Sequence, residues 1–242
     1  MKIAVCLHLY HLDMWDEICK YLNNITNPYE LHVNIVKNDQ RVIDKIMNYK
    51  KDTKITKSPN KGMDIGGFLY SYKNVSEEID LVLKLHTKKG LGDEKNPSNS
   101  LKKFGIDEAK RIGNRWFLNL MNGVLRNKNQ VNNILLEFKN NKKCGMTGFK
   151  LYDNFDKNLK EMEKIFPMFN IKSLPNGSRF IGGTMFWADN KSLKKYLTNK
   201  KIDELLSVLP NGYVREPSPN HAMERIFGCF IYKEKKEVKV IL

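Results

Sequence analysis

Two long apolar runs mark the first third of the chain. The first covers residues 2–9. The second, residues 79–85, reads Ile-Asp-Leu-Val-Leu-Lys-Leu and is followed by His86-Thr87-Lys88-Lys89. Apolar runs of this length that stop at polar residues are typical of buried strands in a parallel sheet. Ligands bind at the carboxyl ends of such strands in open α/β sheets, so we expect the chemistry between His86 and Lys89.

The rest of the pattern alternates between helical and strand periodicity. It predicts strands at residues 31–36, 54–56, 144–149 and 180–188 and an edge strand in the tail. It predicts helices at residues 13–23, 42–47, 65–72, 158–166, 192–209 and 221–232, with two more between 107 and 139. This order predicts an α/β fold with a mostly parallel, doubly wound, Rossmann-like sheet flanked by helices. We expect one domain over residues 1–242, and a mobile loop or lid at the polar stretch 90–103.

Composition narrows the class of protein. No stretch approaches the roughly 18–20 apolar residues that span a bilayer, and the N-terminus lacks a cleavage site, so we expect a cytoplasmic protein. The four cysteines are far apart and show no CxxC spacing, which argues against zinc and disulfides. The net charge of +15 fits an anionic partner, but lysines spread along the whole chain fit solvated surface charge better.

The segment between the third and fourth predicted strands contains three glycines and, beside them, two short polar residues. Gly62, Gly66 and Gly67 match neither a Walker A loop nor a dinucleotide fingerprint. A plain tight turn explains them, yet Asn60 and Asp64 beside them are short polar groups able to grip ribose or sugar hydroxyls.

The polar residues that follow the second apolar run have two readings. A diphosphate would suit His86-Thr87-Lys88-Lys89, which is short of carboxylates and so a poor divalent-metal site. A strand-end polar cluster without a special role is the alternative.

The last third offers candidates for acid–base chemistry and for sugar contact. His221 and Glu224 share a predicted helix face with Arg225 beside them, and a Glu near a cleft is a credible general base. A Glu–Arg surface helix is the alternative. Trp187 follows two glycines and could pack against a sugar ring, or it belongs to a buried strand.

Five ordered segments resemble the rhamnan synthesis protein F-like glycosyltransferases. They are IAVCLHLY (3–10), NKGMDI (60–65), LKLHTKK (83–89), GTMFWA (183–188) and HAMERIF (221–227). The resemblance implies a GT-A-like nucleotide-sugar fold that transfers a sugar, often rhamnose, to a growing surface polysaccharide. Family members often carry Trp-Arg in the middle helix, whereas this chain has Arg115-Trp116, so no role is assigned to an arginine there.

The resemblance also implies roles for individual residues. Many GT-A enzymes end the equivalent strand in a DxD that binds a metal, and here His86-Thr87-Lys88 takes that place. Lys88 and Lys89 would then neutralise the diphosphate with little or no metal, Mn²⁺ or Mg²⁺ with the donor being the alternative. In a single, inverting displacement, Glu224 would be the base, with Asp64 as the second candidate. The implied donor-binding residues are His8, Asn60, Gly62, Asp64, His86, Thr87, Lys88 and Lys89. The implied acceptor-binding residues are Trp187, His221 and Arg225.

The implied partners are a nucleotide-sugar donor and a glycan or lipid-linked glycan acceptor. Peripheral contact with a membrane is compatible with a lipid-linked acceptor, and no nucleic acid is expected. The rival reading is a non-catalytic basic module that binds nucleic acid or an anionic membrane surface. A transferase fold that has lost its activity is the third reading, since the DxD is missing.

Overall fold

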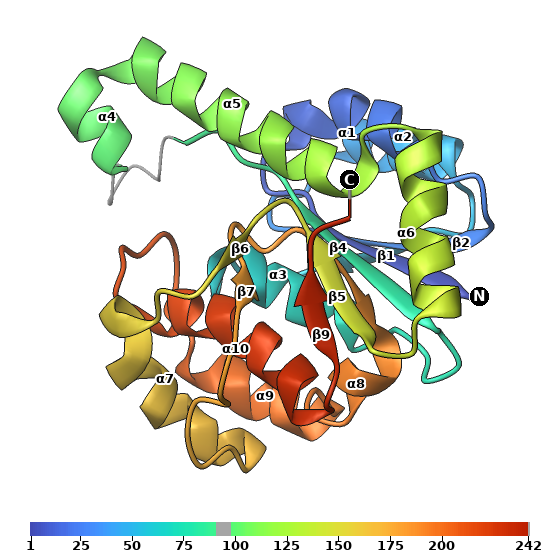
Figure 1. The fold of residues 1–242 in the computed structure, drawn as a ribbon. Coiled ribbons are helices and arrows are strands. Elements are labelled where there is room, and N and C mark those ends of the chain that lie inside the picture. Colours follow the sequence, from blue (N-terminus) through green and yellow to red (C-terminus); the bar gives the residue numbers. More distant parts are fainter. Residues whose placement is uncertain (91–97, 242) are drawn as a thin grey trace.

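A seven-stranded sheet runs through the middle of the molecule (Figure 1). The structure is a computed structural model and describes residues 1–90 and 98–241. The strand order is β3-β2-β1-β4-β8-β5-β9. The strands are β1 (Ile3–His8), β2 (Tyr29–Ile35), β3 (Lys54–Lys57), β4 (Leu81–His86), β5 (Cys144–Gly148), β8 (Phe186–Asp189) and β9 (Glu237–Lys239).

The sheet is mostly parallel, as the alternation of helices and strands predicts. Strands β1 to β4 pair in parallel and so do β5 and β9, whereas β8 lies antiparallel between β4 and β5. The predicted continuous strand 180–188 is wrong. Its first residues form β7 (Phe180–Ile181), which pairs with β6 (Leu151–Tyr152) in a separate ribbon, and the chain turns before β8 begins.

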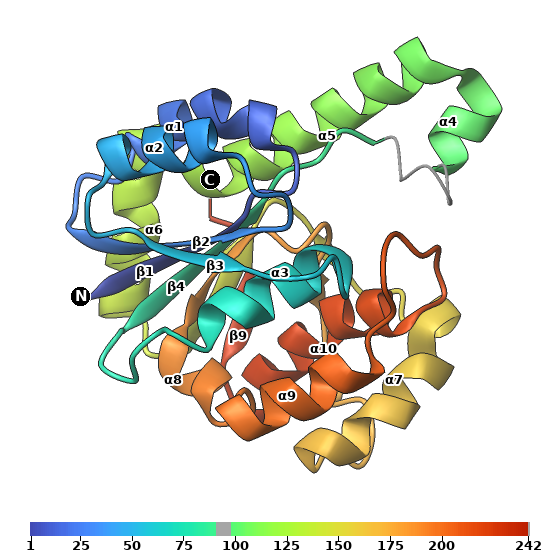
Figure 2. The ribbon, with the colours of Figure 1, turned by 180° about the vertical axis from the view of Figure 1, so that it is seen from behind.

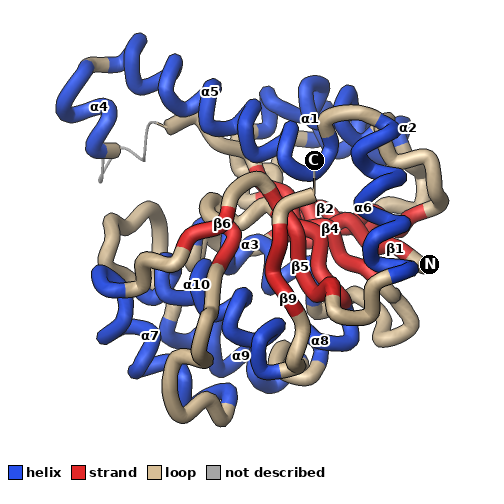
Figure 3. Tube along the Cα trace, in the orientation of Figure 1, coloured by secondary structure: helices blue, strands red, loops and turns tan. Residues whose placement is uncertain are grey.

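Helices cover both faces of the sheet, which gives the Rossmann-like α/β arrangement (Figures 2 and 3). One core lies under α1 (Trp15–Leu22), α2 (Gln40–Tyr49), α5 (Ile106–Leu125) and α6 (Lys128–Asn140). The other lies under α3 (Met63–Tyr72), α7 (Leu159–Ile165), α8 (Asn190–Lys194), α9 (Asn199–Val208) and α10 (Pro219–Lys233). Within residues 1–90 and 98–241, no helix is long and apolar enough to cross a membrane.

The alternation of side chains along β4 aims its polar residues at one helix layer. Leu81, Leu83 and Leu85 enter the core under α1 and α5. Successive side chains of a strand point to opposite faces, so Val82, Lys84 and His86 face α3 and α10. This places a lysine and a histidine inside an otherwise apolar layer.

A helical arm replaces much of the predicted loop. Residues 99–104 form α4 (Asn99–Phe104), so the loop prediction is wrong there, and residues 91–97 of that prediction lie outside the described residues. The helix α4 and the first half of α5 project from the body of the molecule (Figures 1 and 2). We call residues 99–115 the arm.

Candidate functional site

A cavity of about 320 Å³ opens at the carboxyl ends of β1 and β4, beside the first turn of α3. This volume lies in the range of roughly 300–1,000 Å³ that is usual for small-molecule sites. Seven of the eight predicted donor-binding residues line it: His8, Asn60, Asp64, His86, Thr87, Lys88 and Lys89. Strand ends from different parts of the sequence therefore converge on one space.

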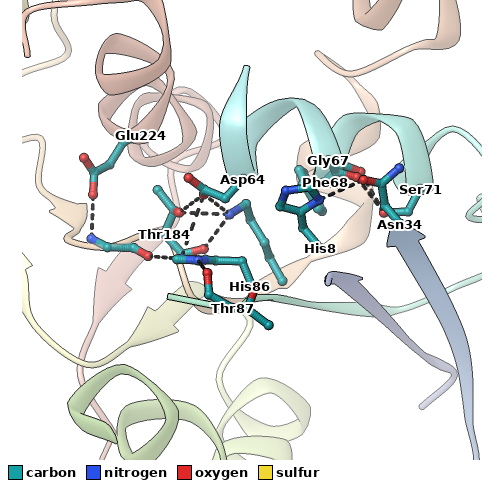
Figure 4. Close-up of polar contacts among 12 residues, drawn as sticks. His8, Asn34, Asp64, Gly67, Phe68, Ser71, His86, Thr87, Thr184 and Glu224 are labelled. Atoms are coloured by element: carbon teal, nitrogen blue, oxygen red, sulfur yellow. Dashed lines mark hydrogen bonds and ion pairs between the residues drawn. The ribbon is translucent and has the colours of Figure 1, made fainter. Parts of the chain in front are cut away.

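The cavity wall contains a buried ion pair. The Lys84 side chain is fully buried and its Nζ lies 2.7 Å from Oδ2 of Asp64. Lys84 Nζ also donates to the carbonyl oxygen and to Oγ1 of Thr184, both at 2.9 Å. The Thr184 hydroxyl in turn donates to Asp64 Oδ2 at 2.5 Å (Figure 4). Each donor of this cluster thus meets an acceptor, as a buried charge requires.

The electrostatics of the pair keep Asp64 ionised. Burial alone would raise the pKa of the Asp64 carboxyl, but the Lys84 ammonium and its hydrogen bonds outweigh burial and hold that pKa well below its ordinary value. Burial lowers the pKa of Lys84, and Asp64 opposes this change. Asp64 is therefore a fixed negative charge and a poor acceptor of a proton at neutral pH.

The backbone around Thr184 adopts a conformation that non-glycine residues rarely take. Gly183 and Thr184 have φ of 78° and 53°. A left-handed threonine costs roughly 1–3 kcal/mol and persists where surrounding contacts impose it. Here Lys84 and Asp64 hold both oxygens of Thr184. The ion pair and the strained turn before β8 thus belong to one arrangement.

His86 connects the end of β4 to the same turn. Its Nε2 lies 2.8 Å from the carbonyl oxygen of Gly183, and its Nδ1 lies 3.1 Å from that of Thr87. Burial lowers the pKa of His86 to about 4, so the ring is neutral at pH 7 and carries one N–H. The shorter contact favours the tautomer that donates from Nε2 to Gly183.

His8 is fixed at the end of β1 by polar and steric contacts. Its Nδ1 lies 2.8 Å from Oδ1 of Asn34, and Nδ2 of Asn34 donates to Ser58 Oγ at 2.9 Å. A Cβ at Gly67 would lie 2.0 Å from this Nδ1, so only glycine allows α3 to approach the ring so closely. Burial lowers the pKa of His8 to about 4. The ring is a neutral part of the cavity wall.

The residues after β4 supply hydroxyl and ammonium groups. Thr87 Oγ1 accepts a hydrogen bond from the backbone N–H of His11 at 3.0 Å. Lys89 forms an ion pair with Asp13. Lys88 lines the cavity and makes no ion pair within the described part of the chain. It is therefore the lysine of this segment whose charge is available to an anionic ligand.

Glu224 lies next to the ion-pair cluster, on α10. Its Oε1 accepts the N–H of Gly183 at 2.5 Å, and the carbonyl oxygen of the same residue contacts His86, so Gly183 links the two side chains (Figure 4). Its side chain is 16% exposed, and Arg225 Nη1 lies 3.4 Å from Oε2. Burial raises the pKa of the Glu224 carboxyl, and Arg225 opposes this change. Glu224 does not line the cavity itself.

The structure contradicts two of the predicted acceptor contacts. Trp187 is 0% exposed, lies in the core, and donates its Nε1–H to the carbonyl oxygen of Val124. Arg225 is also buried, where it pairs with Glu216 at 2.6 Å and lies over the ring of Phe180. Both side chains are held inside the protein and are not placed to contact an acceptor.

Two further predicted residues lie beside the cavity rather than in its lining. His221 is half-buried and its Nδ1 lies 2.8 Å from Ser218 Oγ. Gly62 caps the start of α3 with φ of 72°. Neither lines the cavity.

Four residues at the candidate site were not predicted from the sequence. Lys84 was predicted only as part of an apolar strand. A lysine between two leucines of a buried strand requires a buried partner, and this was the signal for its role. The aromatic residues Tyr10, Trp116 and Tyr213 line the cavity. These residues, and not the buried Trp187, place aromatic side chains at the cavity. Tyr10 ends one of the five segments that resemble the family, and Trp116 stands in the middle helix beside Arg115. Nothing in the sequence indicated that these two residues and Tyr213 lie at one cavity.

The donor set does not fit a resident divalent cation. Within residues 1–90 and 98–241, no group of three His, Cys, Asp or Glu side chains could hold a metal ion. In the cavity, Oδ2 of Asp64 already accepts hydrogen bonds from Lys84 and Thr184. A hard cation needs several oxygen ligands at short range.

Comparison with protein-family models identifies the family of this chain. A family model described as rhamnan synthesis protein F matches residues 1–236, nearly the whole chain. No curated protein matches the sequence. The family match confirms the resemblance carried by the five sequence segments.

Replacing Lys84 tests the buried ion pair. We expect Lys84→Met to lower the free energy of unfolding by about 3–5 kcal/mol, because it leaves the Asp64 carboxylate buried without its partner. The double variant Lys84→Met/Asp64→Asn should recover part of this loss, since it buries no charge. Urea denaturation at neutral pH measures both.

Lys54→Met is the matched control, because Lys54 is also a strand lysine but pairs with Glu30 in solvent. We expect it to change the free energy of unfolding by less than about 1 kcal/mol. Equal effects of Lys84→Met and Lys54→Met would contradict the importance given to the buried pair.

Proposed function

Because the chain belongs to the rhamnan synthesis protein F family, we propose that it transfers a sugar from a nucleotide-sugar donor to a glycan acceptor. Membership in this family links the chain to rhamnan synthesis and thus to polysaccharide biosynthesis. The finer assignments are a GT-A-like transferase, rhamnose or a similar sugar as the transferred group, and inversion at the anomeric carbon. The Rossmann-like sheet with its cavity at the strand ends supports the first of these, and the family's link to rhamnan synthesis supports the second.

The observation that carries the proposal is the cavity with its unpaired lysine. A diphosphate brings negative charge that must be neutralised as it leaves. Lys88 is the lysine beside His86 and Thr87 that has no carboxylate partner in residues 1–90 and 98–241. The aromatic rings of Tyr10, Trp116 and Tyr213 offer faces for a base or a sugar. One site thus offers groups for both parts of a nucleotide sugar.

In the proposed displacement, an acceptor hydroxyl oxygen forms a bond to the anomeric carbon while the bond from that carbon to the diphosphate oxygen breaks. The acceptor approaches from the side of α10, where Glu224 lies next to the cavity lining, and its hydroxyl proton passes to Glu224. The diphosphate leaves with its charge opposed by Lys88. Glu224 suits the base role better than Asp64, because burial raises the pKa of Glu224 whereas Lys84 holds that of Asp64 low. Asp64 would orient the donor as a fixed charge.

The proposed donor chemistry needs no resident metal ion, since Lys88 takes the role of the cation. Thermal unfolding of the protein with UDP-, dTDP- and GDP-sugars, each with Mn²⁺ and with EDTA, tests this directly. A ligand that binds only the folded state raises its melting temperature. We expect a rise with one nucleotide class that survives EDTA. A rise that requires Mn²⁺ would refute the metal-sparing site, and no rise with any donor would favour the non-catalytic basic module.

We expect Glu224→Gln to lower the rate of sugar transfer by about 10²–10⁴-fold, because the general base is lost. The affinity for the donor should stay nearly unchanged. Initial rates and calorimetric titration of the donor measure the two effects. Glu163→Gln, at an exposed glutamate of α7, is the control and should transfer at the wild-type rate. A wild-type rate in Glu224→Gln would refute the base assignment.

The same variant has a pH signature of its own. A raised pKa in the folded protein means that Glu224 costs stability as the pH rises above its unfolded value of about 4.3. Glu224→Gln should therefore be more stable than the wild type at pH 7, and the difference should shrink towards pH 4. Melting temperatures across this range detect the effect whether or not transfer occurs.

We expect Lys88→Ala to weaken donor binding by about 10- to 100-fold, the range for a hydrogen bond to a charged group. Calorimetric titration measures the change. Lys51→Ala is the matched control, because Lys51 is exposed in the turn before β3. This turn lies at the amino ends of the parallel strands, whereas the cavity lies at their carboxyl ends. Equal donor affinities in the two variants would contradict the role of Lys88.

A further inference from the structure

The outer end of the arm exposes two large apolar side chains. Phe104 and Ile106 flank Gly105 at the turn between α4 and α5, and they are 51% and 54% exposed. They are among the most exposed large apolar side chains of the described residues. Figures 1 and 2 show this turn standing away from the rest of the molecule. An exposed apolar pair on a projecting element is the form of a contact surface.

Basic side chains surround this apolar pair. Residues 99–115 contain five basic and two acidic residues, a net charge of +3. Lys102 and Lys103 precede Phe104 directly, and the ammonium of Lys103 lies 5.0 Å from the centre of the Phe104 ring. All three side chains are exposed. Phenylalanine beside lysine on an exposed helix end is a pattern that suits the boundary between lipid headgroups and acyl chains.

The two acidic residues of the arm do not cancel its positive charge. Glu108 is occupied by Arg111, whose Nη2 and Nε lie 2.6 Å and 2.7 Å from its carboxylate oxygens. Asp107 lies in the first turn of α5, where a negative charge is favoured by the helix dipole. Lys102, Lys103 and Lys110 remain without a carboxylate partner within the described residues. The free charge of the outer end is thus positive.

We propose that the outer end of the arm docks this protein on an anionic membrane surface. Phe104 and Ile106 enter the headgroup boundary, and Lys102, Lys103 and Lys110 attract the anionic lipids. Basic residues near such a surface act over roughly a Debye length, and an apolar anchor adds to them. Charge complementarity favours the anionic bilayer over a second copy of this chain, because two arms of the same positive charge repel.

Docking through the arm would also bring the cavity to the membrane. Residues at the two inner ends of the arm, Asn99, Ser100, Ile112 and Gly113, line the cavity. Gly113 packs directly against the backbone of Lys89 and Gly90, so the arm and the end of β4 are in contact. A lipid-linked acceptor would then present its glycan beside the donor. That consequence rests on the proposed function, whereas docking itself does not.

Vesicle flotation with the full chain tests the docking. Vesicles contain either phosphatidylcholine alone or phosphatidylcholine with phosphatidylglycerol, and no nucleotide sugar is present, so the result does not depend on sugar transfer. We expect binding to the anionic vesicles only, weakening as salt is added. Phe104→Ser/Ile106→Ser and Lys102→Gln/Lys103→Gln should each weaken binding by about tenfold or more. Because these positions are exposed, melting temperatures should match the wild type and exclude misfolding.

Two control variants match the tests in chemistry but lie elsewhere. Leu136→Ser removes an equally exposed apolar side chain from α6, and Lys142→Gln/Lys143→Gln removes two adjacent exposed lysines before β5. Both should bind anionic vesicles as the wild type does. Absence of wild-type binding, or equal losses in test and control variants, would overturn the proposal. So would sedimentation showing that Phe104→Ser/Ile106→Ser separates a wild-type dimer without affecting flotation.

Discussion

The structure depends on the need to neutralise one positive charge in the middle of its sheet. Lys84 sits on a central strand among leucines and has no access to water. An unpaired ammonium there would cost far more than the protein's usual margin of stability. Asp64 therefore has to lie within reach, which fixes the first turn of α3 against β4. The cavity forms beside this fixed point, between the carboxyl ends of β1 and β4.

The same charge accounts for the irregular path of the chain before β8. Lys84 donates to the carbonyl oxygen and hydroxyl of Thr184, and both contacts require the left-handed turn at Gly183 and Thr184. Once the chain takes this turn, Gly183 meets His86 through its carbonyl and Glu224 through its N–H. The antiparallel strand and the candidate base on α10 are thus positioned by contacts that begin at one lysine.

The central strands and their polar ends could be predicted from the sequence, whereas long-range pairings could not. An apolar run that stops at His86 predicts a buried strand, which is confirmed, and the structure has a cavity at the end of this strand. The break between β7 and β8, after Ile181, was not predicted, because an apolar run does not show where one strand ends and the next begins. The burial of Arg225 was not predicted, because helical periodicity identifies the polar face of a helix but not whether a distant residue such as Glu216 pairs with a side chain on that face. Trp187 was predicted to contact a sugar, because the two glycines before it suggested that a ligand could approach the backbone there.

Two carboxylates close to one cluster have been given opposite protonation behaviour by their surroundings. Lys84 holds the pKa of Asp64 far down, and burial raises that of Glu224, which the charge on Asp64 also favours. Separation of two pKa values in this way divides labour between acids in many enzyme sites. A carboxylate that never gains a proton can orient a ligand, and one whose pKa lies nearer neutrality can accept a proton from a hydroxyl. The buried lysine therefore shapes the candidate site twice, by holding Asp64 in place and by making Asp64 a weaker candidate for the base than Glu224.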